Sequence, residues 1–297
     1  MNKTAYQPWA AALVTVLLWA SAFPMIKLAL HDFSPVPLAA LRFAVAGITL
    51  IVLLGIKNPA PSAAAGAEIY TPKIFLRLGL AALMGIAGYN VLLNTGQKTI
   101  NAGAASFIVN TVPVFTVILG ASLLKERFTF WAWVGMGISF SGVALIASTQ
   151  PGGLSFGAGA FWVLGAAICQ AAFFITQKPL VSLLGPLRTT AIVVIAGALW
   201  LSPWLPHAIA EARDASWTSL ATVAYLGIFP AAAGYATWSY AQAHFGASRA
   251  ANFLYLVPPV AVAIAWITSA ETPNTLTAIG GMLAILGVGV INTRGRG

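Results

Sequence analysis

The sequence predicts an all-α polytopic membrane protein, with ten transmembrane helices arranged as two inverted five-helix repeats around a central cavity. Three observations lead to this prediction: the composition, the succession of apolar runs and an internal repeat. Of the 297 residues, 59% are hydrophobic and 7% are charged, and the mean hydropathy is +0.88. A soluble domain carries about 25% charged residues, so the chain is expected to lie mostly in lipid. Disorder, collagen and coiled coil have other compositional signatures and are excluded.

The net charge of +9 does not indicate a nucleic-acid partner, because the basic residues are spread singly between apolar runs. The single cysteine, Cys169, lies within an apolar run, which excludes a disulfide framework and offers no metal-ligand spacing. We therefore predict no metal and no cofactor. The first apolar run continues to about Leu30 without a small-residue cleavage site, so we interpret it as a retained helix and not as a signal peptide.

The apolar runs are separated by Pro, Gly, Asn and charged residues, and each is long enough to form a spanning helix of roughly 20 residues. The longest connection, between Lys57 and Lys73, is rich in proline and alanine and is predicted to be a loop. The predicted helices cover residues 8–30, 36–56, 74–95, 102–124, 129–148, 157–178, 188–206, 217–240, 248–270 and 275–292.

The basic residues orient this topology, since cytoplasmic loops carry an excess of Lys and Arg. With the N-terminus in the cytoplasm, the outer side holds only Lys98 and Arg213, and Lys27 and Arg42 lie within helices. Both termini are thus predicted to be cytoplasmic. The inner side then holds Lys3, Lys57, Lys73, Arg77, Lys125, Arg127, Lys178, Arg188, Arg249, Arg294 and Arg296.

An internal repeat is the strongest signal in the sequence. An ungapped shift of 145 residues places Pro113 on Pro258, and Gly88-Tyr89 matches Gly234-Tyr235 with a one-residue slip. Near the start of each half, Phe23-xxx-Lys27 resembles Phe174-xxx-Lys178. The same shift of 145 pairs Glu126 with Glu271, Gly135 with Gly280, and Gly142-Val143 with Gly287-Val288.

The repeat divides the chain into residues 8–148 and residues 157–292, each with five predicted helices. Because five is odd, the second half must begin on the opposite side of the membrane, so the two halves are inverted. Inverted repeats are typical of secondary transporters, whose substrate site lies near the midplane between the halves. A duplication that serves stability alone is the alternative.

Each half resembles one EamA domain of the drug/metabolite transporter superfamily. The resemblance rests on Leu18-Trp19-Ala20-Ser21 with Phe23 and Lys27, on Pro113 followed by Lys125-Glu126-Arg127, on the Gly135…Gly142-Val143 helix, and on the second-half counterparts of these motifs. It implies a ten-helix exporter with both ends in the cytoplasm. Size and polar aromatic helices are similar to those of the YddG-like bacterial amino-acid exporters. The sequence departs from the family pattern at Gln170, where a tryptophan is expected, so the two halves are expected to contribute unequally to the site.

Charged residues within the membrane are costly and therefore informative. All six carboxylates lie in predicted loops or at helix ends, which disfavours a mid-membrane proton-binding carboxylate; Glu126 and Glu271 are expected to cap loops or pair with bases. Lys27 and Arg42 lie within helices. Each either extends its charge to the interface or faces the cavity, where it would hold a substrate carboxylate.

Uncharged polar and aromatic residues are the better site candidates. Asn90, Asn94 and Gln97 share one helix face, which cannot face lipid cheaply, although interhelical hydrogen bonds would explain such a face equally well. Together the candidates suggest a cavity for a zwitterion with an apolar side chain. The predicted substrate-binding residues are Trp19, Ser21, Arg42, Tyr89, Asn90, Asn94, Asn110, Gln177, Tyr235, Trp238 and Tyr255.

Pro113 and Pro258 occupy equivalent positions in the two halves, and each is expected to kink its helix and act as a hinge. The glycines around Gly142 and Gly287 make the fifth and tenth predicted helices small-faced, which indicates close packing within the chain or across a dimer.

These observations predict a bacterial inner-membrane secondary transporter that exports small metabolites, most of all amino acids, by alternating access. Its expected partners are a small-molecule substrate and the lipid bilayer, as a monomer or homodimer. An exporter of drugs, organic cations or nucleotide-sugar-like metabolites is the alternative, and an intramembrane enzyme or a non-transporting scaffold belongs to a different class. No G-x-x-x-x-G-K-[ST] loop, H-E-x-x-H or G-x-S-x-G motif occurs, so ATP use and hydrolysis are not expected. Proton antiport and facilitated diffusion both remain open.

Overall fold

The computed structural model describes residues 6–57, 71–100, 102–123, 128–149, 158–269 and 274–294. Within these ranges the regular structure is helical, without a β-strand. Lipid offers no hydrogen-bond partner to backbone N–H and C=O groups, and a helix satisfies them within one segment. The all-helical prediction is confirmed. Glu126 and Glu271 lie outside the described residues, and so does most of the predicted loop between Lys57 and Lys73.

The first half of the chain forms helices whose limits lie within a few residues of the predicted ones. The predicted helix over 74–95 contains a π-helical stretch, and the predicted helix over 102–124 is interrupted at Asn110-Thr111. The elements are α1 (Gln7–Ala29), α2 (Pro35–Lys57), α3 (Pro72–Ala82), η3 (Leu83–Gly88, π-helical), α4 (Tyr89–Gln97), α5 (Ala102–Val109), α6 (Val112–Leu123) and α7 (Phe130–Ser148).

The second half has matching interruptions. A π-helical stretch precedes Gly234-Tyr235, and a 3₁₀ stretch precedes Val257. The elements are α8 (Ala158–Leu184), α9 (Pro186–Leu201), η4 (Ser202–Trp204), α10 (Leu205–Asp214), α11 (Trp217–Leu226), η5 (Gly227–Ala233, π-helical), α12 (Gly234–Phe245), α13 (Ala247–Ala251), η6 (Asn252–Leu256), α14 (Val257–Ser269) and α15 (Thr275–Arg294).

Seven helical stretches within the described residues are long and apolar enough to cross a membrane. Shorter apolar helices cover Phe130–Ile146 and Thr275–Ile291. The seven stretches are Gln7–Ala29, Pro35–Ile56, Pro72–Gln97, Ala104–Leu123, Ala158–Leu184, Pro186–Asp214 and Trp217–Phe245.

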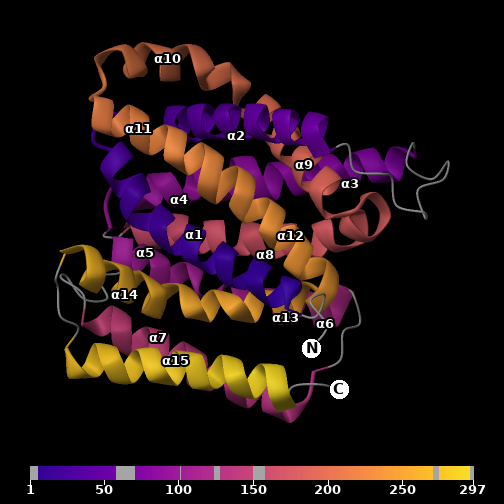
Figure 1. Ribbon diagram of the computed structural model, residues 1–297, viewed down its shortest axis with the longest axis vertical. Helices are drawn as coiled ribbons and strands as arrows, with labels where there is room; N and C mark the ends of the chain where they lie inside the picture. The colour runs from indigo at the N-terminus through magenta and orange to yellow at the C-terminus, as the bar shows by residue number, and fades with distance from the viewer. Residues whose placement is uncertain are drawn as a thin grey trace.

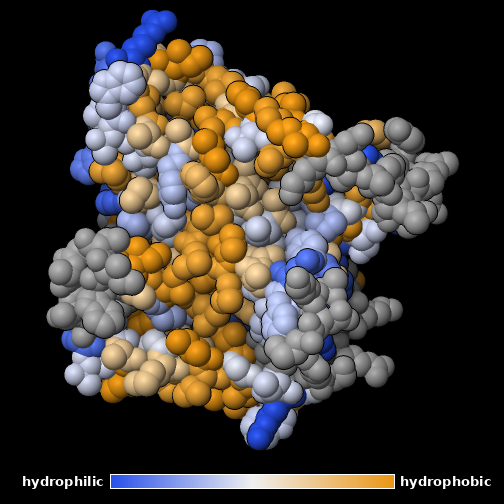
Figure 2. Space-filling model, viewed as in Figure 1, coloured by the Kyte–Doolittle hydropathy of each residue, from blue (hydrophilic) through white to orange (hydrophobic). Residues whose placement is uncertain are grey.

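The outer surface of the helix bundle is apolar, as contact with lipid requires. Figure 2 shows hydrophobic residues over most of the visible face, with hydrophilic residues toward its margins. Large side chains such as Ile56 and Phe161 are three-quarters exposed, which is rare for such residues in a soluble domain. Exposed tryptophans, a residue enriched at membrane–water interfaces, lie near helix ends at Trp131, Trp200, Trp204 and Trp217.

Prolines and glycines mark several helix ends. Pro35, Pro72 and Pro186 are the first residues of α2, α3 and α9, where the missing N–H has no helical partner in any case. Gly185 and Gly246 end α8 and α12 with φ of +82°, a conformation that other residues rarely adopt. The sharp turns they make return the chain into the bundle.

Two helices lie at the centre of the bundle, α1 and α8 (Figure 1). Helix α1 packs against α12, α14 and α11, whereas α8 packs against α4, α6 and α3. The start of α1 and the end of α15 lie at the same end of the bundle (Figure 1).

Helices α7 and α15 form a tightly packed pair along one edge of the molecule (Figure 1). A Cβ added at Gly135 would lie 2.7 Å from the Gly287 carbonyl oxygen, and one at Gly142 would collide with the Gly280 carbonyl. Ser139 Oγ donates to the Ala284 carbonyl oxygen at 3.0 Å. The small faces predicted from sequence therefore pack against each other within the chain.

Candidate functional site

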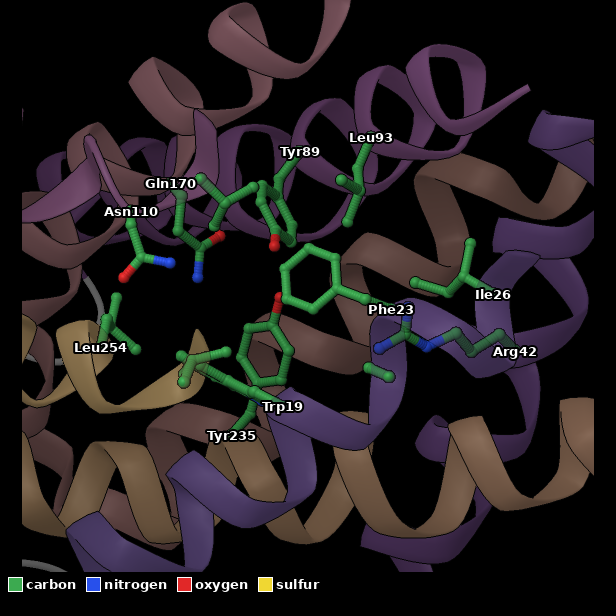
Figure 3. A pocket seen from close by; sticks show the side chains of 13 residues that line it. Trp19, Phe23, Ile26, Arg42, Tyr89, Leu93, Asn110, Gln170, Tyr235 and Leu254 are labelled. Carbon is green, nitrogen blue, oxygen red and sulfur yellow. The ribbon is translucent and has the colours of Figure 1, made fainter. Parts of the chain in front are cut away.

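A cavity lies among helices from both halves of the chain. It comprises about 540 Å³ of space not filled by atoms, part of it open to solvent. Its lining is mostly apolar and aromatic, with three polar or charged side chains besides two tyrosines and a tryptophan. The lining residues are Trp19, Ala22, Phe23, Ile26, Arg42, Tyr89, Leu93, Val109, Asn110, Gln170, Tyr235, Leu254 and Val257 (Figure 3).

Arg42, on α2, brings a positive charge into the wall of this cavity. Its side chain is 4% exposed, and its guanidinium lies 5.2 Å from the centroid of the Phe43 ring. No carboxylate of the described residues forms an ion pair with it; its Nε donates to the Leu226 carbonyl oxygen at 3.3 Å and its Nη1 to Asn90 Oδ1 at 3.1 Å. Buried cations are normally paired, because an isolated one is costly. Arg42 thus offers a positive charge with free N–H donors at the cavity.

The two acceptors of Arg42 are themselves held in place. Asn90 Nδ2 donates to the Ile86 carbonyl oxygen at 2.9 Å, which turns Oδ1 toward the guanidinium. In a regular α-helix the Leu226 carbonyl would accept from the N–H of residue 230, but this residue is Pro230, inside the π-helical η5. Pro230 thus removes the α-helical donor, and the Leu226 carbonyl accepts from Arg42.

The two cavity tyrosines follow the two π-helical stretches. Tyr89 begins α4 directly after η3, and Tyr235 is the second residue of α12 after η5. The Tyr235 hydroxyl donates to the carbonyl oxygen of Gly85, within η3, at 3.0 Å. A Cβ at Gly85 would collide with the Phe173 ring, so the close packing of this ring on η3 needs a glycine here. π-Helical stretches occur frequently at functional sites.

An aromatic cluster supports the cavity wall at Trp19. The Trp19 indole N–H donates to the Pro230 carbonyl oxygen at 3.1 Å. Its ring lies parallel to Phe174, with centroids 6.4 Å apart, and Phe174 stacks on Trp238 at 4.1 Å. Tyr235 meets Trp19 edge-on at 5.4 Å. These contacts hold Trp19 in one orientation toward the cavity.

The end of the cavity away from Arg42 carries two amide side chains. Figure 3 shows Asn110 and Gln170 side by side there, with the rings of Phe23, Tyr89 and Tyr235 between them and Arg42. Both amides are buried. The cavity therefore has a cationic end, an aromatic middle and an amide end.

Comparison with known proteins identifies the family. Residues 9–148 and 157–293 match the EamA-like transporter family. The chain belongs to this family. The resemblance inferred from the sequence motifs is confirmed, and the family name is that of transporters and not of enzymes.

Family members with curated names align with nearly the whole chain of this EamA-like protein. A "Probable terminal-alkyne amino-acid exporter" of Streptantibioticus cattleyicolor is 34% identical and aligns with 96% of this chain and 93% of its own. An "Uncharacterized transporter YdfC" of Bacillus subtilis is 33% identical over 97% of this chain and 92% of its own. A "Probable amino-acid metabolite efflux pump" of Escherichia coli is 25% identical over 93% of this chain and 92% of its own.

A solved crystal structure has the same fold. It is 17% identical in sequence and superposes with a TM-score of 0.71, covering 97% of this chain and 96% of that one. At this identity the likeness concerns the fold alone.

Within this EamA-like fold, five of the residues predicted to bind substrate line the cavity: Trp19, Arg42, Tyr89, Asn110 and Tyr235. They come from α1, α2, α4, the turn after α5, and α12. The structure thus brings together residues that are far apart in the sequence. Four of the five, Trp19, Arg42, Asn110 and Tyr235, donate hydrogen bonds that fix their orientation.

The other six predicted residues lie outside the cavity lining. Asn90 supports Arg42, and Asn94 Nδ2 donates to the Pro35 carbonyl oxygen at 2.9 Å. Ser21 Oγ shares a 2.7 Å hydrogen bond with the Tyr225 hydroxyl. Gln177 Nε2 donates to Ser239 and Gln242, Trp238 stacks on Phe174, and Tyr255 is fully buried.

Eight cavity residues were not in the sequence-based set, Phe23 and Gln170 among them, and one basic residue binds backbone carbonyls outside the cavity lining. Phe23 and Gln170 line the cavity, although Phe23 was notable only for the repeat and Gln170 for replacing a tryptophan. The offset of 151 residues that pairs Phe23 with Phe174 also pairs Trp19 with Gln170. This repeat correspondence could have predicted that Gln170, like Trp19, lies at the site. Lys27 Nζ donates to the carbonyl oxygens of Gln97 at 2.6 Å and Ile100 at 3.2 Å, at the end of α4.

The two predicted hinge prolines lie directly after helix interruptions. Pro113 is the second residue of α6, after the break at Asn110-Thr111, and Pro258 is the second residue of α14, after the 3₁₀ stretch η6. A proline in the first turn of a helix does not remove a helical hydrogen bond. The expected mid-helix kink is thus a break between two helices, with the proline starting the second one.

Proposed function

We propose that this chain is a secondary transporter that exports amino acids or amino-acid-like metabolites, neutral ones above all, across the bacterial inner membrane. The observation that carries the proposal is Arg42, a buried guanidinium in the cavity wall without a carboxylate partner among the described residues. A guanidinium has five N–H donors, of which two are used here, so enough remain for a bidentate contact with a substrate carboxylate. The printed names of two relatives support the same substrate class.

Organic cations fit this site less well than zwitterions. The positive charge of Arg42 is permanent at physiological pH and repels another cation at close range in a medium of low dielectric. A zwitterion places its carboxylate on Arg42, and its ammonium group is then attracted to the faces of the neighbouring aromatic rings. An exporter of organic cations remains the competing outcome of the test below.

The proposal includes two inverted five-helix repeats, residues 8–148 and 157–292, with ten spans. One hydrogen bond that recurs in both halves supports it. Gln97 Nε2 donates to the Phe23 carbonyl oxygen, and Gln242 Nε2 donates to the Phe174 carbonyl oxygen. These residues correspond to each other under the offsets found in the sequence.

The cavity lining supports the same symmetry. Trp19 and Gln170, Tyr89 and Tyr235, and Val109 and Leu254 are repeat-related pairs, and both members of each pair line the cavity. A site between inverted halves is the arrangement expected for alternating access.

Alternating access requires paired flexible points, and we place them at the helix breaks before Pro113 and Pro258. Each break leaves a short non-α segment next to the cavity, because Asn110 and Leu254 line it. Both chain ends are taken to be cytoplasmic. The common position of the start of α1 and the end of α15 (Figure 1), and the basic residues of the corresponding loops, support this orientation.

Flux into proteoliposomes tests the proposal. The purified chain is reconstituted, and uptake of radiolabelled neutral amino acids is compared with uptake of a lipophilic organic cation, each with and without a pH gradient. Saturable uptake of amino acids is the expected result. Acceleration by the gradient identifies proton coupling, whereas equal uptake without it identifies facilitated diffusion. Saturable uptake of the cation alone would overturn the proposal.

A further inference from the structure

The amide end of the cavity contains hydrogen-bond acceptors that nothing in the protein uses. Asn110 Oδ1 and Gln170 Oε1 are buried and have no hydrogen-bond partner, although their side chains are only 1% and 3% exposed. Leaving a buried acceptor unpaired costs free energy, so the large majority of buried side-chain polar atoms in proteins have a partner. Two unpaired acceptors at one end of a substrate cavity indicate that a ligand supplies the donors.

The amide of Asn110 is tied to its own helix, which leaves its oxygen available. Its Nδ2 donates to the Ser106 carbonyl oxygen at 2.7 Å, at the point where α5 ends. One amide hydrogen is thus committed to the backbone, and Oδ1 remains without a donor from the chain.

The amide end also breaks the symmetry of the two repeats. Gln170 corresponds to Trp19 and Asn110 corresponds to Tyr255, so one half provides an amide where the other provides an aromatic ring. Arg42 adds to this asymmetry at the opposite end. The two ends of the cavity therefore differ chemically, so a ligand whose own ends differ should bind in one orientation.

With its carboxylate on Arg42, an amino acid keeps its α-ammonium group toward the cationic end of the cavity. Only one carbon separates the two groups, whereas the rings of Phe23, Tyr89 and Tyr235 lie between Arg42 and the amides (Figure 3). We therefore assign the donors at the amide end to the far end of the substrate's side chain.

Resting on the proposed function, we infer that Asn110 and Gln170 select amino acids whose apolar or aromatic side chain ends in an N–H or O–H donor. The carboxylate binds Arg42, the apolar segment lies among the aromatic rings, and the terminal donor binds the amide oxygens. Sites that hydrogen-bond a substrate group discriminate strongly against analogues without it, because their buried polar groups are then left unpaired.

Matched ligand pairs test this selectivity on the purified, full-length protein. Kd is measured by isothermal titration for tyrosine against phenylalanine and for tryptophan against 1-methyltryptophan, whose indole lacks the N–H. We expect the donor-bearing member of each pair to bind about tenfold more tightly. Gln170→Met and Asn110→Leu should each reduce the ratio of the two Kd values within each pair, and the melting temperature of each variant in detergent shows separately whether it folds.

Asn252→Leu is the matched control, because Asn252 Oδ1 is also buried without a partner but lies outside the cavity lining. This variant should keep the full preference. Equal binding of the members of each pair in the wild type, or a preference that survives both cavity variants, would overturn this inference alone. Absence of binding for all four amino acids, together with saturable uptake of the organic cation alone in the proteoliposome assay, would overturn the proposed function and this inference with it.

Discussion

Arg42→Gln should weaken substrate binding while the fold remains stable. The wild-type guanidinium donates to Leu226 and Asn90 and keeps three of its five N–H donors for a ligand. A hydrogen bond to a charged group contributes about 1.5–3 kcal/mol, so loss of the carboxylate contact should weaken binding by about 10- to 150-fold. The fold should persist, because no carboxylate among the described residues would be left buried without its counter-ion.

The assay compares Kd for an amino acid with Kd for its methyl ester, in the wild type and the variant. The wild type should prefer the acid by the factor given above, and Arg42→Gln should bind both compounds equally. Arg213→Gln is the control for the loss of a positive charge, since Arg213 is exposed at the end of α10. An undiminished preference for the acid in Arg42→Gln would show that the carboxylate lies elsewhere and would refute the reasoning.

Three further predictions concern residues around the cavity and at the ends of the bundle. Asn90→Ala should impair flux while expression is kept, because Arg42 loses an acceptor that orients it; wild-type flux would contradict this. Gly142→Leu should prevent close packing of α7 on α15 and lower the melting temperature in detergent, whereas Gly137→Leu, with open space around Gly137, should not. The pKa of Asp32 lies below its ordinary value of 3.8, first because the Ser216 N–H donates to the carboxylate. A lowered pKa stabilises the fold above the unfolded pKa, and this contribution disappears as the pH falls through the folded pKa. Asp32→Asn should therefore destabilise the protein at pH 7, and the difference from the wild type should shrink as the pH falls below 3.8.

The helix face formed by Asn90, Asn94 and Gln97 shows what the periodicity of a sequence can and cannot predict. All three side chains are buried, as the polar face predicted. None of them lines the cavity; they hold Arg42, the Pro35 carbonyl and the Phe23 carbonyl instead. Spacing along a helix tells which face avoids lipid, but a neighbouring helix and a cavity both satisfy that condition.

The sequence was equally unable to distinguish the two basic residues within predicted helices. From sequence, Lys27 and Arg42 had the same alternatives. In the structure Lys27 binds carbonyl groups at the end of α4, and Arg42 is buried in the cavity wall. The difference depends on which helices surround each residue, and no local pattern contains that information.

By itself the sequence determined the membrane class, the positions of most helices and the family, because these follow from composition, apolar length and collinear motifs. The repeat also indicated where corresponding contacts would lie. Only the tertiary structure decided which side chains line the cavity and which hold helices together. It did so because the cavity is formed by residues from α1, α2, α4, α8 and α12, whose apposition arises only when the helices pack. The buried charge of Arg42 and the unpaired amide oxygens of Asn110 and Gln170 became visible for the same reason.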